Sequence, residues 1–147
     1  MVKRVQHSQS SSCPMACALD AIGDHWSLLI IRGMMFVETH EYKDFLAMPE
    51  SISSNILTDR LKKLEKCAMI KSAPHPKSKR RKLYYLTPKG KNLAPVLIEI
   101  ARWAAENLGD DVFIPEDKRP YFDMPLKDVT AMTLEKLSAW EKENIPS

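Results

Sequence analysis

Residues 53–91 have the sequence SSNILTDRLKKLEKCAMIKSAPHPKSKRRKLYYLTPKGK, and this stretch decides the fold. Its first part, from Ser54 to about Cys67, follows Ser53, a residue type that caps helices by accepting a backbone hydrogen bond. Apolar residues recur there with the spacing of one helix face: Leu57, Leu61 and Leu64. The segment is therefore predicted to be a helix that a core holds by its leucines, with polar and basic side chains facing outward.

The second part of the stretch is predicted to be a β-hairpin. Met69–Ala73 and Leu83–Leu86 are the candidate strands, and Pro74–Pro76 turn the chain between them. Five of the six residues in Lys77–Lys82 are basic, so we expect a positively charged tip. From Arg60 to Lys91 there are twelve basic residues and a single acid. A basic helix followed by a basic hairpin suits the phosphate backbone of duplex DNA.

Three helices are predicted before this stretch. Pro14 starts the first, which ends at Gly23. Asp24 is the expected N-cap of a second helix, whose high apolar content indicates a central, buried position. A short third helix covers Glu41–Ala47 and stops before Pro49.

A long helix is predicted after the hairpin, starting at Thr87 and Pro88. Pro95 should bend it or confine regular hydrogen bonding to the part that follows. Its apolar stripe is wide: Leu93, Val96, Leu97, Ile100, Trp103, Ala104 and Leu108. Such a stripe favours a second subunit, although burial against the chain's own first helix would also use it. The predicted fold class is mainly α with a small β-hairpin, and the N- and C-terminal helices of the domain form the expected dimer interface.

The chain of 147 residues is long enough for one domain with a real core. Residues 1–12 are polar and serine-rich and are expected to be disordered. The domain spans residues 13–110, and residues 111–147 form an acidic extension with one helix near Thr130–Glu143. Residues 1–110 contain 17 Lys and Arg against 11 Asp and Glu, whereas residues 111–147 contain 5 against 8. The extension could pack on the domain or extend a dimer contact.

Several classes of protein are disfavoured. The best apolar run, Trp26–Phe36, is too short to span a membrane and contains Arg32, and no signal-peptide core is present, so a cytoplasmic protein is expected. The four histidines lack metal-binding spacing, the three cysteines do not form a disulfide framework, and no glycine-rich phosphate loop occurs. We therefore expect no metal, no cofactor and no enzymatic activity.

The predicted order of elements is that of a winged helix-turn-helix, and the sequence resembles the HxlR-type transcriptional regulators, which are related to the broader MarR-like winged-helix group. The motifs that carry the resemblance span residues 13–108: Cys13-Pro14, Leu19-Asp20-Ala21-Ile22-Gly23, Trp26, Ile52-Ser53, Leu57-Thr58-Asp59-Arg60-Leu61, Leu64-Glu65, Tyr84-Tyr85-Leu86-Thr87-Pro88-Lys89-Gly90 and Trp103. The resemblance implies a homodimer on a roughly palindromic operator, with the recognition helix in the major groove and the wing near the minor groove. Regulators of this type are often repressors and sometimes activators.

The chain departs from the family pattern at four places. His25 stands where a lysine is usual, and Glu41-Tyr42 replace an Arg-Phe pair, which affects one expected backbone contact. Ala68 stands where the turn usually holds glycine, so that turn must avoid a left-handed backbone or accept strain. The acidic extension is longer than usual.

The candidate DNA contacts lie on the predicted recognition helix and wing. On the helix they are Ser54, Asn55, Thr58, Asp59, Lys62 and Lys63, and on the wing Lys77, Lys79, Arg80 and Arg81. Asparagine can pair bidentately with adenine, and lysine reaches guanine acceptors or phosphate. Asp59 could accept from cytosine or pair with a neighbouring cation. Ser54, near a helix N-terminus, could donate to phosphate. Arg60 lies closer to the leucine face and suits structure or phosphate more than bases.

Cys13 is the candidate redox sensor. It precedes a helix, whose N-terminus favours a thiolate. The resemblance adds that some regulators of this type sense oxidants or electrophiles through a cysteine at this place. Cys17 lies one turn later, where an unstrained bridge to Cys13 is poorly placed. A bond between the Cys13 residues of two subunits, or alkylation, fits better, whereas a residue with no sensing role is the alternative.

The sequence thus favours a sequence-specific, DNA-binding transcriptional regulator that forms a homodimeric repressor and responds to oxidants or electrophiles. Its expected partners are duplex DNA, a second copy of the chain and a small effector. Two alternatives stay open. One is a regulator gated by a small apolar ligand, for which Met15, Met34 and Met35 could line a pocket. The other is a winged-helix interaction module without operator binding.

Overall fold

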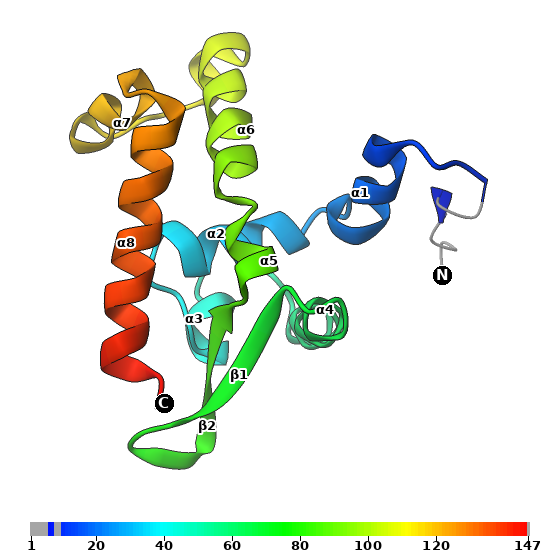
Figure 1. Ribbon diagram of the computed structural model, residues 1–147, viewed down its shortest axis with the longest axis vertical. Coiled ribbons are helices and arrows are strands. Elements are labelled where there is room, and N and C mark those ends of the chain that lie inside the picture. The colour runs from blue at the N-terminus through cyan, green and yellow to red at the C-terminus, as the bar shows by residue number, and fades with distance from the viewer. Residues whose placement is uncertain (1–5, 8–9, 147) are drawn as a thin grey trace.

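The computed structural model of the protein describes residues 6–7 and 10–146 (Figure 1). Its α-helices are α1 (Pro14–Ile22), α2 (Ser27–Phe36), α3 (Tyr42–Leu46), α4 (Ser54–Lys66), α5 (Pro88–Lys91), α6 (Ala94–Asn107), α7 (Arg119–Asp123) and α8 (Leu126–Asn144). Strands β1 (Ile70–His75) and β2 (Ser78–Leu86) form one antiparallel hairpin, and two short 3-10 turns cover Gly109–Asp111 and Glu116–Lys118. The predicted fold class, mainly α with a small β-hairpin, is confirmed, whereas the dimer interface stays a prediction. The expected disorder of residues 1–12 falls largely on residues 1–5 and 8–9, which lie outside the described part, and it stays a prediction.

The core is built around α2. Ile30, Ile31 and Met34 of this helix are almost fully buried, together with Phe45 of α3. Leu57, Leu61 and Leu64 of α4 pack into the same cluster, as their spacing predicts. The Ser53 side chain accepts a hydrogen bond from the Ile56 amide at 3.3 Å, which caps α4. The helix that carries the candidate DNA contacts is therefore anchored by its apolar face and begins at the expected residue.

The hairpin is longer than expected. Ile70 pairs with Leu86, and the pairing continues to His75 opposite Ser78, with an irregularity between Pro74 and His75. Only residues 76–77 form the turn. The basic segment at residues 79–82, which was predicted to form the tip, instead lies within β2. Proline is tolerated at Pro74 because in a two-stranded sheet one edge of each strand needs no backbone partner.

The predicted long helix after the hairpin is divided in two. Thr87 caps α5 by accepting from the Gly90 amide, and α5 ends at Lys91. Helix α6 starts anew at Ala94, with Pro95 in its first turn, where the missing N–H costs no helical bond. This is the second of the two outcomes expected for Pro95.

The acidic extension packs on the domain and contains two α-helices rather than one. Helix α8 starts at Leu126, before the expected Thr130, and α7 precedes it. Val129, Thr133 and Leu137 of α8 are buried, and α8 runs beside α6 and α2 (Figure 1). Among residues 6–7 and 10–146, no helix has the length and apolar character needed to cross a membrane.

Helix α1 differs from every other long helix. It projects from the side of the molecule (Figure 1), and none of its residues is buried. Only Ala21 and Ile22 in its last turn touch the core, whereas Met15 is 76% exposed. The apolar side chains of Met15 and Leu19, before that last turn, therefore face solvent in the single chain.

Candidate nucleic-acid interface

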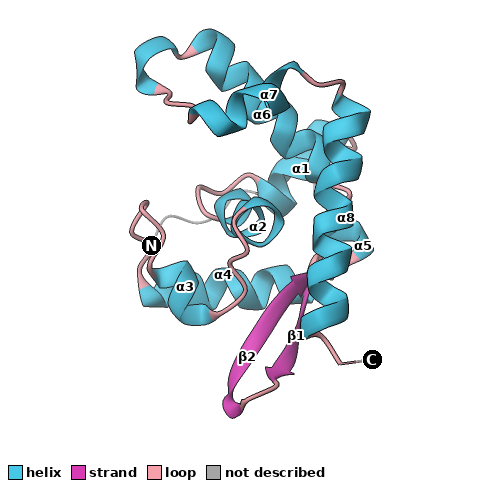
Figure 2. Ribbon diagram, turned by 90° about the vertical axis from the view of Figure 1, so that its left-hand side faces the viewer, coloured by secondary structure: helices cyan, strands magenta, loops and turns pink. Residues whose placement is uncertain are grey.

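Helices α3 and α4 and the hairpin lie toward one end of the molecule, opposite α7 (Figure 2). The leucine face of α4 is buried, so the other face must point away from the core. Asn55 and Lys62 are exposed on it, and their side chains make no hydrogen bond or ion pair with any described residue. Ser54, in the first turn of α4, is also exposed. These three residues lie where the sequence predicted and are accessible to a ligand.

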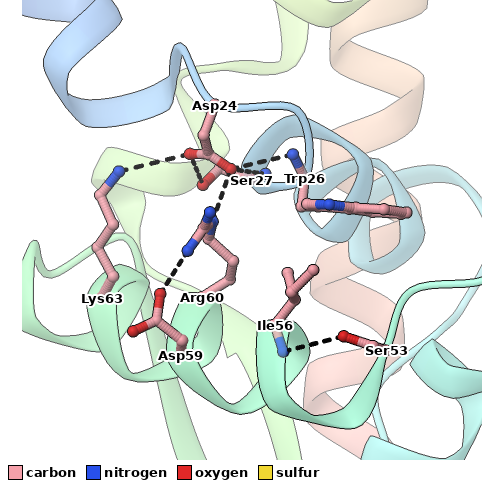
Figure 3. Close-up of polar contacts among 8 residues, drawn as sticks. All are labelled: Asp24, Trp26, Ser27, Ser53, Ile56, Asp59, Arg60 and Lys63. Atoms are coloured by element: carbon pink, nitrogen blue, oxygen red, sulfur yellow. Dashed lines mark hydrogen bonds and ion pairs between the residues drawn. The ribbon is translucent and has the colours of Figure 1, made fainter. Parts of the chain in front are cut away.

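Asp24 joins the start of α2 to α4 (Figure 3). Its carboxylate accepts hydrogen bonds from the Trp26 amide at 3.0 Å, the Ser27 amide at 2.9 Å and the Ser27 hydroxyl. From α4, Arg60 Nε donates at 2.9 Å and Lys63 Nζ lies 3.4 Å from the carboxylate. Burial alone would raise the pKa of Asp24, but the hydrogen bonds from Ser27, Trp26 and Arg60 outweigh it and hold the pKa well below its usual range. The carboxylate is thus a charged clamp between two helices.

The clamp corrects the placement of Lys63. We expected its side chain to project toward DNA, but it turns back to Asp24, and only 20% of the side chain is exposed. The nearly buried carboxylate has a side-chain exposure of 10%, and a charge in that position is stable only with cationic partners. The structural role expected for Arg60 is confirmed, and Arg60 also pairs with the exposed Asp59.

Tyr42 of α3 holds the polar side of α4. Its hydroxyl donates to the Ser54 carbonyl at 3.0 Å and lies 2.9 Å from the Thr58 hydroxyl. Because the single Tyr42 proton is given to Ser54, the Thr58 hydroxyl donates to the Tyr42 oxygen. Thr58 is exposed, but part of its hydrogen-bonding capacity is therefore used inside the protein. The tyrosine that replaces the family's phenylalanine adds a polar contact that the sequence did not predict.

The wing carries exposed cations along β2 and its turn. Lys77, Lys79 and Arg80 are exposed, and their side chains have no partner among the described residues. Arg81 differs, because its guanidinium forms two hydrogen bonds with the Glu41 carboxylate, from Nε at 2.6 Å and from Nη2 at 2.7 Å. Arg81 is therefore held against the start of α3 rather than extended from the wing.

Cys13 occupies the N-cap position of α1 and is exposed. The backbone N–H groups of Ala16 and Met15 lower the pKa of its thiol, as expected for a thiolate at a helix N-terminus. Cys17 is also exposed, one turn further along α1, and Cys67 is half-buried at the end of α4. In the described residues no group of three or more His, Cys, Asp or Glu side chains could hold a metal ion.

A family model described as HxlR-like helix-turn-helix matches residues 21–112. The chain belongs to the HxlR-like helix-turn-helix family. The family and its curated relatives are DNA-binding transcriptional regulators rather than enzymes, so this HxlR-like protein is a helix-turn-helix transcriptional regulator. The match ends before α7 and α8, which are therefore additions to the HxlR-like domain.

Relatives and solved structures agree with this assignment. The HTH-type transcriptional regulator YvaP of Bacillus subtilis is 35% identical over 100 residues, which cover 67% of this chain and 92% of YvaP. The crystal structure of PA1607, a putative transcription factor, superposes with a TM-score of 0.62 at 34% identity, over 76% of this chain and 73% of PA1607. The oxidised form of the redox regulator HypR superposes with a TM-score of 0.56 at 26% identity, over 65% of this chain and 97% of HypR.

The polar clamps were the part of the HxlR-like site that the sequence did not indicate. Asp24 was predicted only as the N-cap of α2, but the N-cap is Trp26, and Asp24 lies in the preceding turn, where its carboxylate accepts from the Trp26 and Ser27 amides. Its contact with Arg60 crosses 36 residues, and the contact of Glu41 with Arg81 crosses 40. Periodicity describes neighbours along one helix or strand and carries no signal for such pairs.

Proposed function

We propose that the protein is a homodimer that binds a two-fold operator in duplex DNA, with α4 in the major groove and the hairpin beside the minor groove. The proposal rests on the observation that α4 has two sets of polar side chains, one that holds the helix in place and one that stays available to a ligand. Asp24 binds Arg60 and Lys63 and so holds the helix. Asn55 and Lys62 stay exposed on its outer face, without a side-chain partner among the residues that the structure describes. We also propose that the protein is located in the cytoplasm, because its proposed operator is found there.

Base choice rests on few side chains in this arrangement. Asn55 is the proposed adenine contact, and Lys62 reaches a guanine edge or a phosphate. Ser54 lies in the first turn of α4, where its hydroxyl and the free backbone amides suit a phosphate oxygen. Thr58 can add a contact through the capacity that Tyr42 leaves free. Asp59 and Lys63 are engaged with protein groups and contribute to orientation instead.

The hairpin supplies contacts that do not depend on sequence. Lys77, Lys79 and Arg80 are exposed and have no ion-pair partner in the part of the chain that the structure describes, so they can approach phosphates without first breaking an ion pair there. Arg81 can join them only by leaving Glu41. We therefore expect Arg80→Ala combined with Lys79→Ala to weaken binding to every DNA sequence and to flatten its salt dependence. An unchanged salt slope would contradict the wing assignment.

Two unpartnered apolar surfaces support the homodimer. Helix α1 exposes Met15 and Leu19, and α6 exposes Ile100 and Trp103, the latter to 59%. A second copy of the same chain would cover both and would set two copies of α4 against two half-sites. Sedimentation velocity tests this directly, with Trp103→Glu expected to give a monomer and Glu106→Gln, an exposed change on the same helix, expected to leave the dimer intact.

Operator binding is tested by selecting tight-binding duplexes from a random pool and measuring affinity by fluorescence anisotropy. Asn55→Ala should weaken the selected duplex about 10-fold and relax the preference at one base position in each half-site. Glu135→Ala, an exposed substitution on α8, is the matched control and should leave affinity unchanged. If no duplex is retained above random DNA, the protein is an interaction module that uses the same fold. Repression, the proposed sign of regulation, is tested with the selected duplex placed over a reporter promoter.

Cys13 favours a second element of function, a response to oxidants or electrophiles. Its thiol is exposed and its pKa is lowered, and it precedes α1, a helix in which no residue is buried. HypR, a structural relative, is a redox regulator. Treatment with diamide should change DNA affinity in the wild type and not in Cys13→Ser, while Cys17→Ser should respond like the wild type. Equal responses of wild type and Cys13→Ser would remove Cys13 as the sensor.

A further inference from the structure

A cavity of about 360 Å³ lies between α2, α6 and the added helices α7 and α8. Its walls are mainly apolar: Met34, Met35, Leu97, Phe122, Val129 and Trp140. Met15, which the sequence suggested as a third methionine of a pocket, lies on α1 and takes no part. Volumes of 300–1,000 Å³ with apolar walls are typical of small-molecule sites. Because α7 and α8 follow the family match at residues 21–112, the cavity is a feature that the extension creates.

Cations outnumber acids around this cavity. Arg102, Lys118 and Lys136 line it, with Glu38 as the acidic member. Arg102 is engaged, since it donates to the carbonyls of Tyr121 at 3.1 Å and Met124 at 2.6 Å. Lys136 has no hydrogen bond or ion pair with a described residue. Lys118 has an exposed pairing with Asp117 at 3.5 Å, and its Nζ lies 5.9 Å from the centre of the Tyr121 ring. Both lysines are exposed, so they lie where the cavity meets solvent.

His40 connects the cavity with the wing. Its ring lines the cavity and stacks on Trp140 at a centroid distance of 3.4 Å. The ring Nδ1 lies 2.8 Å from the Tyr84 carbonyl, so it must carry the proton and donate, and the Tyr84 amide donates to the His40 carbonyl at 2.8 Å. Tyr84 belongs to β2. One buried side chain, that of His40, therefore contacts both Trp140 and the wing strand.

We propose that this cavity binds a small carboxylate with an apolar body, and that its occupancy alters the position of the wing through Trp140 and His40. The apolar walls take the body, and Lys118 and Lys136 pair with the carboxylate at the opening. Lys136 is suited to this because it has no competing hydrogen bond or ion pair within residues 6–7 and 10–146. The effect on the wing rests on the proposed DNA binding, whereas the binding site itself does not.

Binding is measured by isothermal titration calorimetry at pH 7.5 with decanoate and, as a neutral probe of equal chain length, decanol. Wild type should bind decanoate more tightly than decanol. Lys118→Ala combined with Lys136→Ala should weaken decanoate about 5-fold, the upper range for exposed ion pairs, and change decanol less than 2-fold. Lys127→Ala, an exposed lysine of α8 outside the cavity, is the matched control.

A second variant tests the contribution of the cavity itself, independently of the two lysines at its opening. Ala101 lines the cavity and is exposed, so Ala101→Trp can occlude it without repacking the core. This change should weaken both probes at least 10-fold while the far-UV circular dichroism stays that of the wild type. If decanoate and decanol both fail to bind the wild type, or if the occluding variant binds them normally, the site is overturned. A change of sedimentation coefficient in Ala101→Trp would assign the surface to a second copy and would also overturn it.

The effect on the wing is measured by DNA anisotropy with and without saturating decanoate. Wild type should change its DNA affinity at least 3-fold on saturation, and Ala101→Trp should not respond. If decanoate binds but DNA affinity is unchanged, the connection through His40 is overturned and the site stands. If the protein without decanoate binds no DNA, the proposed function fails instead, and calorimetry still decides the site.

Discussion

Arg81 and Glu41 form a two-bond fork that joins β2 to the residue before α3, with N–O distances of 2.6 and 2.7 Å. Bidentate pairing of this kind is stronger and more directional than a single contact. Glu41 stands where the family usually has a basic residue. The chain therefore lacks one cation at that position, and the Glu41 carboxylate holds a second cation, Arg81, in place. The wing is thereby braced against the helix-turn-helix, and part of its positive charge is neutralised.

Glu41→Gln should therefore strengthen DNA binding. The change removes the carboxylate and releases Arg81, which can then contact DNA. Affinity at low salt should therefore rise about 3-fold. The slope of log affinity against log salt should become steeper by the amount that about one added phosphate contact gives. Anisotropy titrations over a series of salt concentrations give both values. Glu135→Gln on α8 controls for the general loss of one negative charge. Weaker binding by Glu41→Gln would show that the brace matters more than the released charge.

Asp24→Asn should destabilise the fold by about 2 kcal/mol, because Arg60 and Lys63 lose a nearly buried partner. Asparagine can still accept from the backbone amides, so the turn before α2 should persist. Urea unfolding followed by circular dichroism measures the loss. Asp59→Asn removes an exposed carboxylate from the same Arg60 and should cost less than about 0.5 kcal/mol. Equal effects of the two changes would contradict the clamp.

The same carboxylate predicts an acid-dependent loss of stability. The pKa of Asp24 is lower in the folded protein than in the unfolded chain, where it is about 3.9. The unfolded chain therefore takes up a proton first, and the stabilisation is complete above that value and declines as pH falls below it. The difference in unfolding free energy between wild type and Asp24→Asn should shrink between about pH 5 and pH 3. A constant difference would exclude Asp24 as the source.

Ala68→Gly should stabilise the protein by about 1 kcal/mol. Ala68 has a φ of +58°, a left-handed conformation in which a Cβ is strained. The turn has thus accepted strain where the family's glycine would avoid it, and the gain is reduced by the greater freedom of glycine in the unfolded chain. Differential scanning calorimetry should show a rise in Tm of a few degrees. Ala105→Gly in α6 is the control and should lower Tm, since helical φ values give glycine no advantage there.

His40 predicts a second pH effect near neutrality. Burial lowers the pKa of His40, and the hydrogen bond to Tyr84 and the charges of Glu38, Glu141 and Asp44 oppose the shift only in part. The unfolded chain therefore binds a proton near its ordinary pKa of about 6.5, before the folded protein does. Stability should be complete above that value and fall as pH decreases below it. His40→Gln should flatten this dependence between pH 7 and pH 5, and the exposed His25→Gln should keep it.

Much of the fold could be predicted from the sequence because its signals are local. The leucine spacing of α4, the cap at Ser53 and the Thr87-Pro88 start of α5 each depend on residues within one or two turns. Where prediction failed, contacts between residues far apart in the sequence determined the structure. The hairpin extends to His75 and Ser78 because strand pairing continues past the prolines, which the strand tendencies of single residues do not reveal.

The site could be predicted less completely. Helical periodicity correctly places Asn55 and Lys62 on the outer face, but Lys63, one residue further, turns to Asp24. Its direction is set by a carboxylate that lies in the loop before α2, 39 residues earlier in the chain. The same holds for Arg81 and Glu41. Charge counts along the chain treat all these cations alike, whereas their partners in three dimensions divide them into those that hold the fold and those that stay available.

The lack of buried residues in α1 has a consequence for how the protein should behave at different concentrations. The helix has nine residues and buries none of them, and isolated helices of that length are marginal in water. In the proposed homodimer a second chain would supply the packing that most of α1 lacks, so the helical population of α1 would obey mass action. In dilute solution α1 should fray, and the N-terminal environment that lowers the pKa of the Cys13 thiol should fray with it. On the proposed homodimer, the reactivity of that thiol would depend on protein concentration, and an oxidation rate would describe the regulator only at the concentration at which it was measured.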